Sequence, residues 1–328
     1  MSTPDSAAMS VILITPDRYE RIRKTVGYLR AQTIRDRLEL IIVAPSIKLL
    51  EADESELKEF FRFRIVSLGQ ITSLPDAMAA GVRAAGAPVI AFGEDHAFPE
   101  PGWAEALWEA HQGPWAAVGP VVRNANPVNW VSWADFLVSY GRWLDPTPAE
   151  TVDFLPSHNC SYKRSILLSY EPQLERTLAV ETVLHWDLSS RGYRLYVEPK
   201  AKLSHINFEG FSTWIAAQFL NGRLLAASRR ENWSPFRRLL YIFGAPLIPV
   251  VRLWRVQRDV RRAGRQHELL PGVLPTLIAG LVVSGTGEFL GYLLGASDRT
   301  VGQLYHLEFN RRLEGQAPLA TGAQGEGH

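Results

Sequence analysis

Two carboxylates and an imidazole stand side by side at Glu94, Asp95 and His96. They follow residues 88–92 (PVIAF), an apolar run that predicts a strand buried on both faces of a sheet. Neighbouring carboxylates repel each other, and a bound cation removes that repulsion. Oxygen ligands suit Mg²⁺ or Mn²⁺, and an imidazole among them favours Mn²⁺. The pattern therefore predicts a divalent-cation site, although a solvated acidic turn would have the same residue types.

Strand-like and helix-like segments alternate through the first half of the chain and must position this acidic block. Continuous apolar runs predict strands over residues 11–15, 38–43, 65–68, 88–92 and 115–118. Helical spacing or composition between them predicts helices over residues 18–32, 51–61, 74–85 and 103–111. This order predicts an α/β fold with a mostly parallel sheet flanked by helices. Ligands of such sheets lie beyond the carboxyl ends of the strands, where the acidic block stands.

Five blocks of the sequence, in this order, resemble the inverting family 2 glycosyltransferases, which have the nucleotide-sugar-binding, Rossmann-like GT-A fold. The blocks are SVILITPDRYERIRKTVGYLRAQT, LELIIV, AFGEDHAFPEPGWAEAL, FLPSHNCSYKRSIL and LAVETVLHWDLSSRGYRLYVEPKAKLSHI. Together they span about residues 10–230. The resemblance implies an enzyme that moves a sugar from a nucleotide-diphosphate donor to a hydroxyl acceptor with the help of Mn²⁺ or Mg²⁺.

The resemblance also implies roles for individual residues. Asp95, His96 and His205 fall on positions that face the metal and the diphosphate, with Glu94 beside them. Glu181 falls on the carboxylate that acts as general base. The turn after the first strand, which borders the nucleotide of the donor, corresponds to Thr15, Pro16 and Asp17.

Two further polar residues, His158 and Asn159, follow the apolar run at residues 152–156 (VDFLP). They could line the sugar pocket of the donor or form a satisfied turn. One carboxylate is enough for inverting transfer if it lies within hydrogen-bond reach of the acceptor hydroxyl. Asp187 is the alternative base, and it lies six residues after Glu181 and therefore on a different face of the predicted helix.

The sequence departs from the family pattern at several points. The acidic block, often three or four Asp residues in the family, reads Glu-Asp-His-Ala here, and the catalytic helix has Val180 and Glu181 in place of an acidic pair. No acid follows the second strand, so the base of the nucleotide stays open. These departures keep open a catalytically impaired relative that acts as a binding or scaffold protein. A nucleotidyltransferase would need a glycine-rich phosphate loop, and residues 15–18 contain no glycine.

The formal net charge of +1 conceals an uneven distribution of charge along the chain. Residues 1–222 carry 21 Lys and Arg against 26 Asp and Glu, whereas residues 223–265 carry 11 Arg against two acids. Residues 252–265 place apolar side chains on one side of a predicted helix and most arginines on the other. Such a basic amphipathic helix is typical of an element that lies on a membrane surface. The alternative is a helical subdomain packed on the catalytic domain or on a second copy of the chain.

Two apolar stretches, residues 239–251 and residues 269–294, flank this helix. Both contain prolines, and the first is shorter than the roughly 20 residues that a spanning helix needs. If the first stretch crossed the bilayer, both its ends would be basic, which the positive-inside rule disfavours. We therefore expect residues 223–297 to attach to anionic lipid at the cytoplasmic face of the cell membrane as a peripheral, monotopic or re-entrant element, with spanning left open. Nucleic-acid binding is not expected, because no base-stacking module accompanies the basic segment.

These observations predict four regions along the chain. They are a disordered N-terminus (residues 1–9), a GT-A catalytic domain (residues 10–222), a basic and apolar helical membrane-association region (residues 223–314) and a disordered tail (residues 315–328). Membrane attachment suggests a lipid-linked or cell-surface glycan as acceptor, and hence polysaccharide biosynthesis. The single cysteine, Cys160, excludes a disulfide framework. The sugar, the nucleotide, the acceptor and a homo-oligomeric state stay open.

Overall fold

The computed structural model describes residues 6–310 apart from residues 157 and 232. The predicted disordered tail at residues 315–328 lies outside the described residues. At the other end the first strand begins at Met9, and Ala7 and Ala8 before it are buried. Ordered structure therefore extends into the N-terminal segment that was expected to be disordered.

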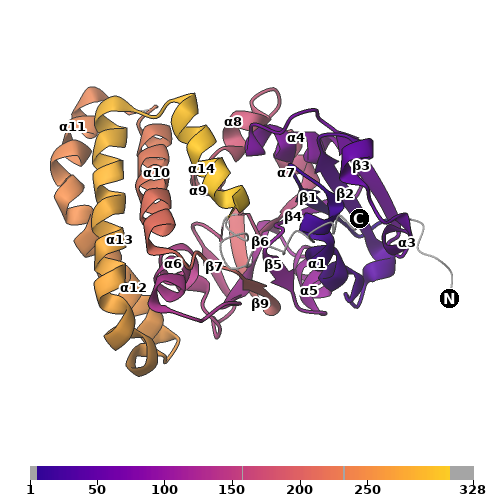
Figure 1. The fold of residues 1–328 in the computed structure, drawn as a ribbon, viewed down its shortest axis with the longest axis horizontal. Helices are drawn as coiled ribbons and strands as arrows, with labels where there is room; N and C mark the ends of the chain where they lie inside the picture. The colour runs from indigo at the N-terminus through magenta and orange to yellow at the C-terminus, as the bar shows by residue number, and fades with distance from the viewer. Residues whose placement is uncertain (1–5, 157, 232, 311–328) are drawn as a thin grey trace, which may run out of the picture.

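Within the described residues, nine strands form one sheet (Figure 1). The strands are Met9–Ile14 (β1), Leu38–Ala44 (β2), Arg62–Ser67 (β3), Val89–Gly93 (β4), Ala97–Pro99 (β5), Trp115–Asn124 (β6), Glu150–Val152 (β7), Ser161–Lys163 (β8) and Arg194–His205 (β9). Their order across the sheet is β3-β2-β1-β4-β8-β6-β9-β5, with β7 paired to β9 off this path.

The sheet is mixed, so the prediction of a mostly parallel sheet is wrong. Strands β1 to β4 pair in parallel, as does β6 with β9. Strand β8 lies antiparallel between β4 and β6, and both β5 and β7 lie antiparallel to β9. The strand–helix alternation that imposes parallel pairing ends at β4. Strands β5, β7 and β8 have three residues each, too few to show a period in the sequence.

Nine α-helices precede β9 in the described part of the chain. They are Tyr19–Arg30 (α1), Ile47–Leu50 (α2), Glu54–Leu57 (α3), Leu74–Ala84 (α4), Trp103–Ala110 (α5), Trp130–Tyr140 (α6), Arg164–Leu168 (α7), Leu174–Leu178 (α8) and Glu181–Ser190 (α9). Among them, α1, α4 and α5 pack on the sheet. Alternate side chains of a strand point to opposite faces. Ile12 of β1 accordingly packs on Gly81 of α4, whereas its neighbours Val11 and Leu13 share a small internal space with α1 and with Trp103 of α5.

The predicted helix over residues 51–61 shortens to α3. Glu51 ends α2 in the left-handed region, with φ +49°. The side chain of Asp53 then accepts a hydrogen bond from the Ser55 N–H and starts a new helix of four residues. The composition correctly predicted helical structure in this segment. The turn at Glu51 and the capping side chain of Asp53 limit it to four residues.

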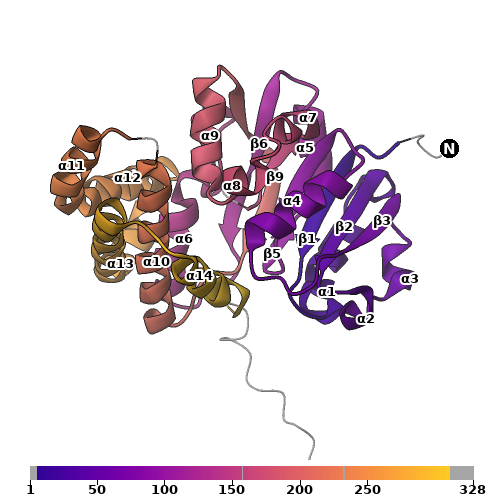
Figure 2. The ribbon, with the colours of Figure 1, turned by 90° about the horizontal axis from the view of Figure 1, so that it is seen from above.

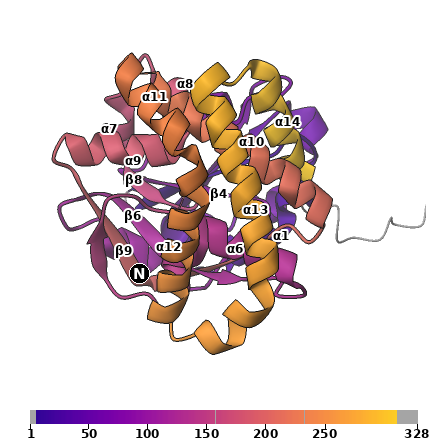
Figure 3. The same cartoon turned by 90° about the vertical axis from the view of Figure 1, so that its left-hand side faces the viewer.

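In the described part of the chain, five more helices follow the sheet. The first four of them stack beside the α/β part (Figures 1 and 3). They are Phe211–Arg230 (α10), Pro235–Gly244 (α11), Ile248–Arg262 (α12), Gln266–Leu294 (α13) and Asp298–Asn310 (α14), with the short 3₁₀ turn Ala245–Leu247 between α11 and α12. Helix α10 runs across residue 222, the expected domain boundary, without a break. Helix α14 returns towards the α/β part, as Figure 2 shows from above.

Glycines let α13 press against α10. A Cβ on Gly287 would lie 2.2 Å from the carbonyl oxygen of Phe219, and one on Gly291 would lie 2.4 Å from that of Arg223. Glu288, between these two glycines, is buried, and its Oε1 lies 3.0 Å from Nη2 of Arg252 on α12. Helix α13 is therefore a packed element of the protein over much of its length.

Among the described residues, two helical segments are long and apolar enough to cross a membrane, judged by length and composition alone. They are residues 235–262 and residues 266–294. Only 11% of the most apolar window of the first segment is buried in the protein, against 44% for the second. The first segment thus leaves far more apolar surface uncovered than the second.

Candidate active site

The turns after β1 and β4 meet at one edge of the sheet. The two strands pair in parallel with Leu13 opposite Gly93, so both chains leave the sheet at the same level. Thr15 and Asp95 each stand two residues beyond that pair. Thr15 is buried, and its Oγ1 accepts a hydrogen bond of 3.3 Å from the Asp17 N–H. The predicted nucleotide turn, in which Pro16 is half-buried and Asp17 exposed, therefore lies beside the acidic block.

One carboxylate and two imidazoles converge at this edge. Glu94, His96 and His205 each offer one ligand atom, and these three atoms lie within 4.8 Å of one another. Nε2 of His205 and Nε2 of His96 lie 3.4 Å and 3.8 Å from the carboxylate oxygens of Glu94. His205 arrives from the end of β9, because the antiparallel pairing of β5 with β9 sets it opposite Ala97.

A hydrogen-bond acceptor orients each of the two histidines. Oδ1 of Asp95 lies 2.6 Å from Nδ1 of His96, and Oδ1 of Asn207 lies 3.1 Å from Nδ1 of His205. The Nδ2 group of Asn207 donates to Oδ1 of Asn124 and to the carbonyl oxygen of His205, so its Oδ1 is the acceptor. Both acceptors favour a proton on Nδ1, so Nε2 of each ring is the nitrogen that faces Glu94 and that would contact a cation bound there.

The positions of Glu94 and Asp95 differ from those predicted from the sequence. Asp95 was predicted as a metal ligand together with His96 and His205, whereas Glu94 is the carboxylate that faces both imidazoles. Asp95 instead contacts the far side of His96, and its Oδ2 lies 3.5 Å from Nε of Arg21. Consecutive residues point in different directions, so Glu94 lies on the Nε2 side of both rings and Asp95 lies on the Nδ1 side of His96.

Glu94 is held in its ionised form. Nδ2 of Asn159 donates a hydrogen bond of 2.7 Å to its Oε2. Burial by itself would raise the pKa of Glu94, but His96, His205 and His158 outweigh that effect and hold the pKa well below its usual range. A carboxylate and two imidazole nitrogens form a donor set that suits Mn²⁺ better than Mg²⁺.

A second carboxylate, Glu181, begins α9 and has no exposed side-chain surface. Its Oε1 accepts a hydrogen bond of 3.1 Å from the hydroxyl of Tyr162, and its Oε2 accepts one from the His158 N–H. Nε2 of His185 lies 2.7 Å from the same hydroxyl, and Nδ1 of His185 accepts a hydrogen bond from the Leu155 N–H. His185 therefore donates to Tyr162, and Tyr162 donates to Glu181.

Burial and one imidazole set the protonation of this second cluster. Burial raises the pKa of Glu181, although His158 and the hydrogen bond from Tyr162 oppose it. Burial also lowers the pKa of His185 to about 3, which keeps this ring neutral. His158 lowers the pKa of Glu94 as well, so one imidazole acts on both carboxylates. The backbone of His158 has φ +65°, an unfavourable conformation of the kind that recurs at functional sites.

Asp187, the alternative base, lies outside this arrangement. Its Oδ2 accepts hydrogen bonds from the hydroxyl of Tyr170 at 2.5 Å and pairs with Nε of Arg191 at 2.8 Å. Its side chain is 40% exposed, whereas that of Glu181 is buried. The six-residue spacing does place the two acids on different faces of α9.

Four residues of the site were not predicted from the sequence: Arg21, Tyr162, His185 and Asn207. A signal existed for two of them, because His185 lies four residues after Glu181 on the same helix face, and Asn207 lies two residues after His205. Arg21 also donates a hydrogen bond of 2.7 Å to the carbonyl oxygen of Phe309, which brings α14 to the edge of the site.

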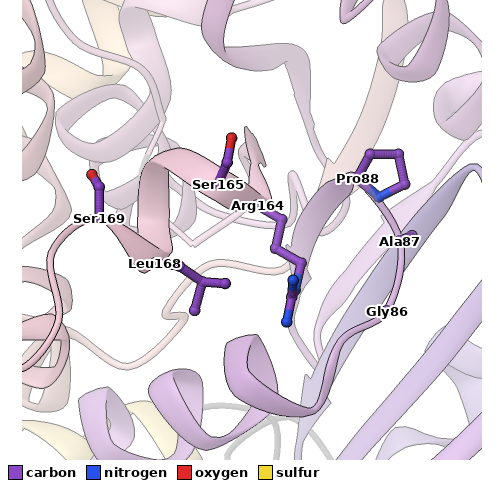
Figure 4. Close-up of a pocket in the computed structure, with 7 residues that line it drawn as sticks. All are labelled: Gly86, Ala87, Pro88, Arg164, Ser165, Leu168 and Ser169. Atoms are coloured by element: carbon purple, nitrogen blue, oxygen red, sulfur yellow. The ribbon is translucent and has the colours of Figure 1, made fainter.

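A cavity of about 600 Å³ lies elsewhere in the molecule (Figure 4). Pro88 lines it together with Arg164 and Ser165. Pro88 comes directly before β4, so the cavity lies at the amino end of the strand whose carboxyl end leads to Glu94. None of the candidate-site residues lines this cavity, so the cavity is separate from the candidate site.

Residues 10–170 match the family model described as Glycosyl transferase family 2. The match covers slightly less than half of the chain and supports a glycosyltransferase enzyme. This glycosyltransferase has its acidic block, His158 and Asn159 within the matched residues, whereas Glu181 and His205 lie beyond them. The mixed sheet flanked by helices is consistent with the GT-A fold.

One solved structure similar to the glycosyltransferase is described as "Crystal structure of GalNAc-T7 with UDP, GalNAc and Mn2+". The two chains are 12% identical, with a TM-score of 0.47. The match covers 62% of this chain and 44% of the other, so it spans less than half of that protein's length. No curated protein matches the chain.

Proposed function

We propose that this glycosyltransferase moves a sugar from a nucleotide-diphosphate donor to a hydroxyl acceptor, with inversion at the anomeric carbon and with Mn²⁺ or Mg²⁺ as cofactor. The observation that carries the proposal is a fully buried carboxylate, Glu181, near the cluster of Glu94, His96 and His205, with His158 acting on both Glu181 and Glu94. Inverting transfer needs one base on the acceptor side and positive charge on the leaving-group side. Two imidazoles in the cluster favour Mn²⁺.

In this mechanism Glu181 accepts the proton of the acceptor hydroxyl while that oxygen bonds to the anomeric carbon. The bond from this carbon to the diphosphate breaks, and its electron pair leaves with the phosphate oxygen. A cation held by Glu94, His96 and His205 would neutralise the charge that develops on the diphosphate. The raised pKa of Glu181 makes it a stronger base.

The remaining candidate residues have positions that suit the donor. Thr15, Pro16 and Asp17 would border the nucleotide, since their turn adjoins the acidic block at the same sheet edge. Asn159 would act through Glu94, which it holds by a hydrogen bond. Because Glu181 is covered, the approach of a hydroxyl requires His158, whose side chain is 39% exposed, to move aside.

Transfer and donor hydrolysis with UDP-, GDP- and dTDP-sugars, measured with and without Mn²⁺, test this function. Glu181→Gln should lower kcat by about 10²- to 10⁴-fold, because the variant cannot accept the proton. Asp187→Asn, on the same helix, is the matched control and should keep full activity. Undiminished transfer by Glu181→Gln would exclude this base. Donor binding without turnover in the wild type would instead support the binding or scaffold hypothesis.

We further propose that the enzyme works at the cytoplasmic face of the cell membrane on a lipid-linked or cell-surface glycan, as a step of polysaccharide biosynthesis. The basic segment at residues 223–265 and the largely uncovered apolar segment at residues 235–262 support this location. The full chain should stay with the membrane fraction in the absence of detergent. Recovery in the soluble fraction under these conditions would contradict the location.

A further inference from the structure

Eight large apolar side chains form one exposed face along α11, the following 3₁₀ turn and α12. Their side chains are exposed by 43% to 80%. We call this face the apolar stripe, and its residues are Phe236, Leu239, Leu240, Phe243, Leu247, Val250, Val251 and Trp254. The intervals of three or four residues are those of one side of a helix, so the side chains lie together.

The stripe is an outer surface of a segment whose inner side is already packed. Ala245, Val256 and Val260 are buried on that inner side. Pro246 and Pro249 each stand in the first turn of a helix, where the missing N–H breaks no hydrogen bond. The segment therefore continues past both prolines as one nearly unbroken rod with a covered side and an apolar, uncovered side.

Positive charge accompanies the stripe. Arg237, Arg255, Arg258 and Arg261 are all exposed on the same two helices. The only acid between residues 235 and 262 is Asp259, which is buried and pairs with Arg258 at 3.3 Å. An apolar face with exposed arginines and a tryptophan is complementary to the interface of an anionic bilayer. Two copies of the stripe facing each other would bring their arginines together, which disfavours a homodimer through this face.

The dimensions favour a helix in the plane of the membrane. Residues 239–251 are uncharged, and as a helix they would extend about 20 Å at 1.5 Å per residue, short of the ~30 Å hydrocarbon core. Helix α13 offers no comparable face, because its contact with α10 buries much of it.

We propose that the apolar stripe docks in plane on an anionic lipid surface, with the exposed arginines on the headgroups and with α13 remaining part of the protein core. This deepens the proposed membrane location and commits it to one face, without depending on the glycosyl-transfer reaction. The stripe side chains insert at the level of the headgroups, so the protein associates with one leaflet. Neither residues 239–251 nor residues 269–294 cross the bilayer.

Co-sedimentation of the full chain with vesicles tests the proposal. Vesicles of phosphatidylcholine with phosphatidylglycerol should bind the wild type, and vesicles of phosphatidylcholine alone should bind it much more weakly. Phe243→Ser combined with Trp254→Ser should weaken binding at least tenfold. Arg255→Gln combined with Arg261→Gln should weaken binding to the anionic vesicles by about 30-fold, the effect of two arginines near a charged surface.

Ile278→Ser combined with Val282→Ser is the matched control, since both residues are exposed apolar positions on α13. This variant should bind vesicles as the wild type does, and circular dichroism should show that all variants are folded. Equal loss of binding in the α13 variant would overturn the assignment of the face. A wild type that does not bind anionic vesicles would overturn the proposal. So would a wild type that light scattering shows to be a dimer, if Phe243→Ser combined with Trp254→Ser dissociates that dimer. Failure of sugar transfer in any variant bears only on the reaction.

Discussion

At the scale of single residues, the candidate site depends on where protons are held. Asp95 and Asn207 each accept from Nδ1 of one histidine, and Tyr162 donates to Glu181. None of these three residues is a proposed ligand or base. They determine which atom of the partner residue a cation or a hydroxyl would contact.

Removing Asp95 should therefore weaken metal binding without removing a ligand. We expect Asp95→Ala to raise the Kd for Mn²⁺ by about 10- to 100-fold, because Nδ1 of His96 loses the acceptor that orients the ring. Calorimetric titration with Mn²⁺ would measure this effect, with Asp187→Asn as the folded control. Unchanged affinity in Asp95→Ala would mean that His96 needs no such support.

The activity of the enzyme should depend on the proton of Glu181. Burial raises the pKa of this carboxyl, so the acid limb of the profile of kcat/KM against pH should lie above the range of an exposed glutamate. The hydroxyl of Tyr162 stabilises the ionised form, so Tyr162→Phe should move that limb to still higher pH. Tyr170→Phe removes an equivalent hydrogen bond to Asp187 and should leave the limb in place. Identical profiles for the wild type and Tyr162→Phe would contradict Glu181 as base.

Two buried histidines should make the fold sensitive to mild acid. Burial lowers the pKa of His111 and of His185 to about 3, and an unfolded chain would protonate both near the usual value of about 6.5. Between these two values the unfolded state binds more protons, so stability is lost as the pH falls from 6.5 towards 3.

The free energy of unfolding in urea, measured from pH 7 to pH 5, should thus fall by up to about 1.4 kcal/mol per pH unit for each histidine. His111→Gln removes one of the two titrating groups and should halve that dependence. An unchanged slope in this variant would show that His111 does not titrate on unfolding. Nε2 of His111 bonds to the hydroxyl of Ser161, so some uniform loss of stability is also expected.

At the scale of elements, glycines of α13 allow the close approach of α10 and α13. They put backbone against backbone, so part of the apolar length of α13 is used in helix packing. Gly287→Ala would place a methyl group 2.2 Å from the carbonyl oxygen of Phe219 and force the helices apart. We expect a loss of about 1–3 kcal/mol in the free energy of unfolding.

Gly302→Ala on α14 is the control for that substitution. A Cβ at this helical position meets no atom within 4 Å, and alanine favours a helix by up to about 1 kcal/mol. The control should therefore be neutral or slightly more stable in thermal unfolding. If both variants behave alike, the two helices have room to separate.

At the scale of the whole molecule, the catalytic part and the helical part share one core. Asp135 of α6 accepts hydrogen bonds from the indole of Trp214 on α10 (3.1 Å) and from the Phe208 N–H (3.0 Å). Trp214 is fully buried, and Gly280 of α13 leaves room for its ring. The charge boundary near residue 222 therefore falls within a single packed unit.

This continuity predicts one cooperative unfolding transition for both parts. Near-ultraviolet circular dichroism and hydrogen exchange in α13 should follow the same denaturation curve. A chain that ends at residue 222 loses α13, which packs on the ring of Trp214 at Gly280, and should not fold stably. A well-folded protein of residues 1–222, or two separate transitions, would contradict this expectation.

The sequence alone predicted several elements of the fold and several residues of the candidate site. The apolar runs predicted the parallel strands β1, β2 and β4, because a strand buried on both faces must be continuously apolar. Strand β3, which is only partly buried, begins three residues before its predicted run. The acidic block followed at the carboxyl end of β4, and Glu181 and His205 were singled out from the resemblance. The spacing of apolar residues and arginines predicted an amphipathic helix at residues 252–265, but the stripe lies mainly before it and shares only Trp254 with it. Val256 and Val260, on the apolar side of that predicted helix, pack against the protein.

Only the tertiary structure decided which of these groups meet. It made the sheet mixed, placed Glu94 and not Asp95 opposite the histidines, and linked Tyr162 to Glu181 and His185. It also packed α13 against α10 and left the apolar stripe uncovered. The physical reason is that local patterns set the direction of a strand or a helix face. The partner across a sheet edge comes from a segment up to 111 residues away, as His205 does for Glu94, and only the folded chain brings the two together.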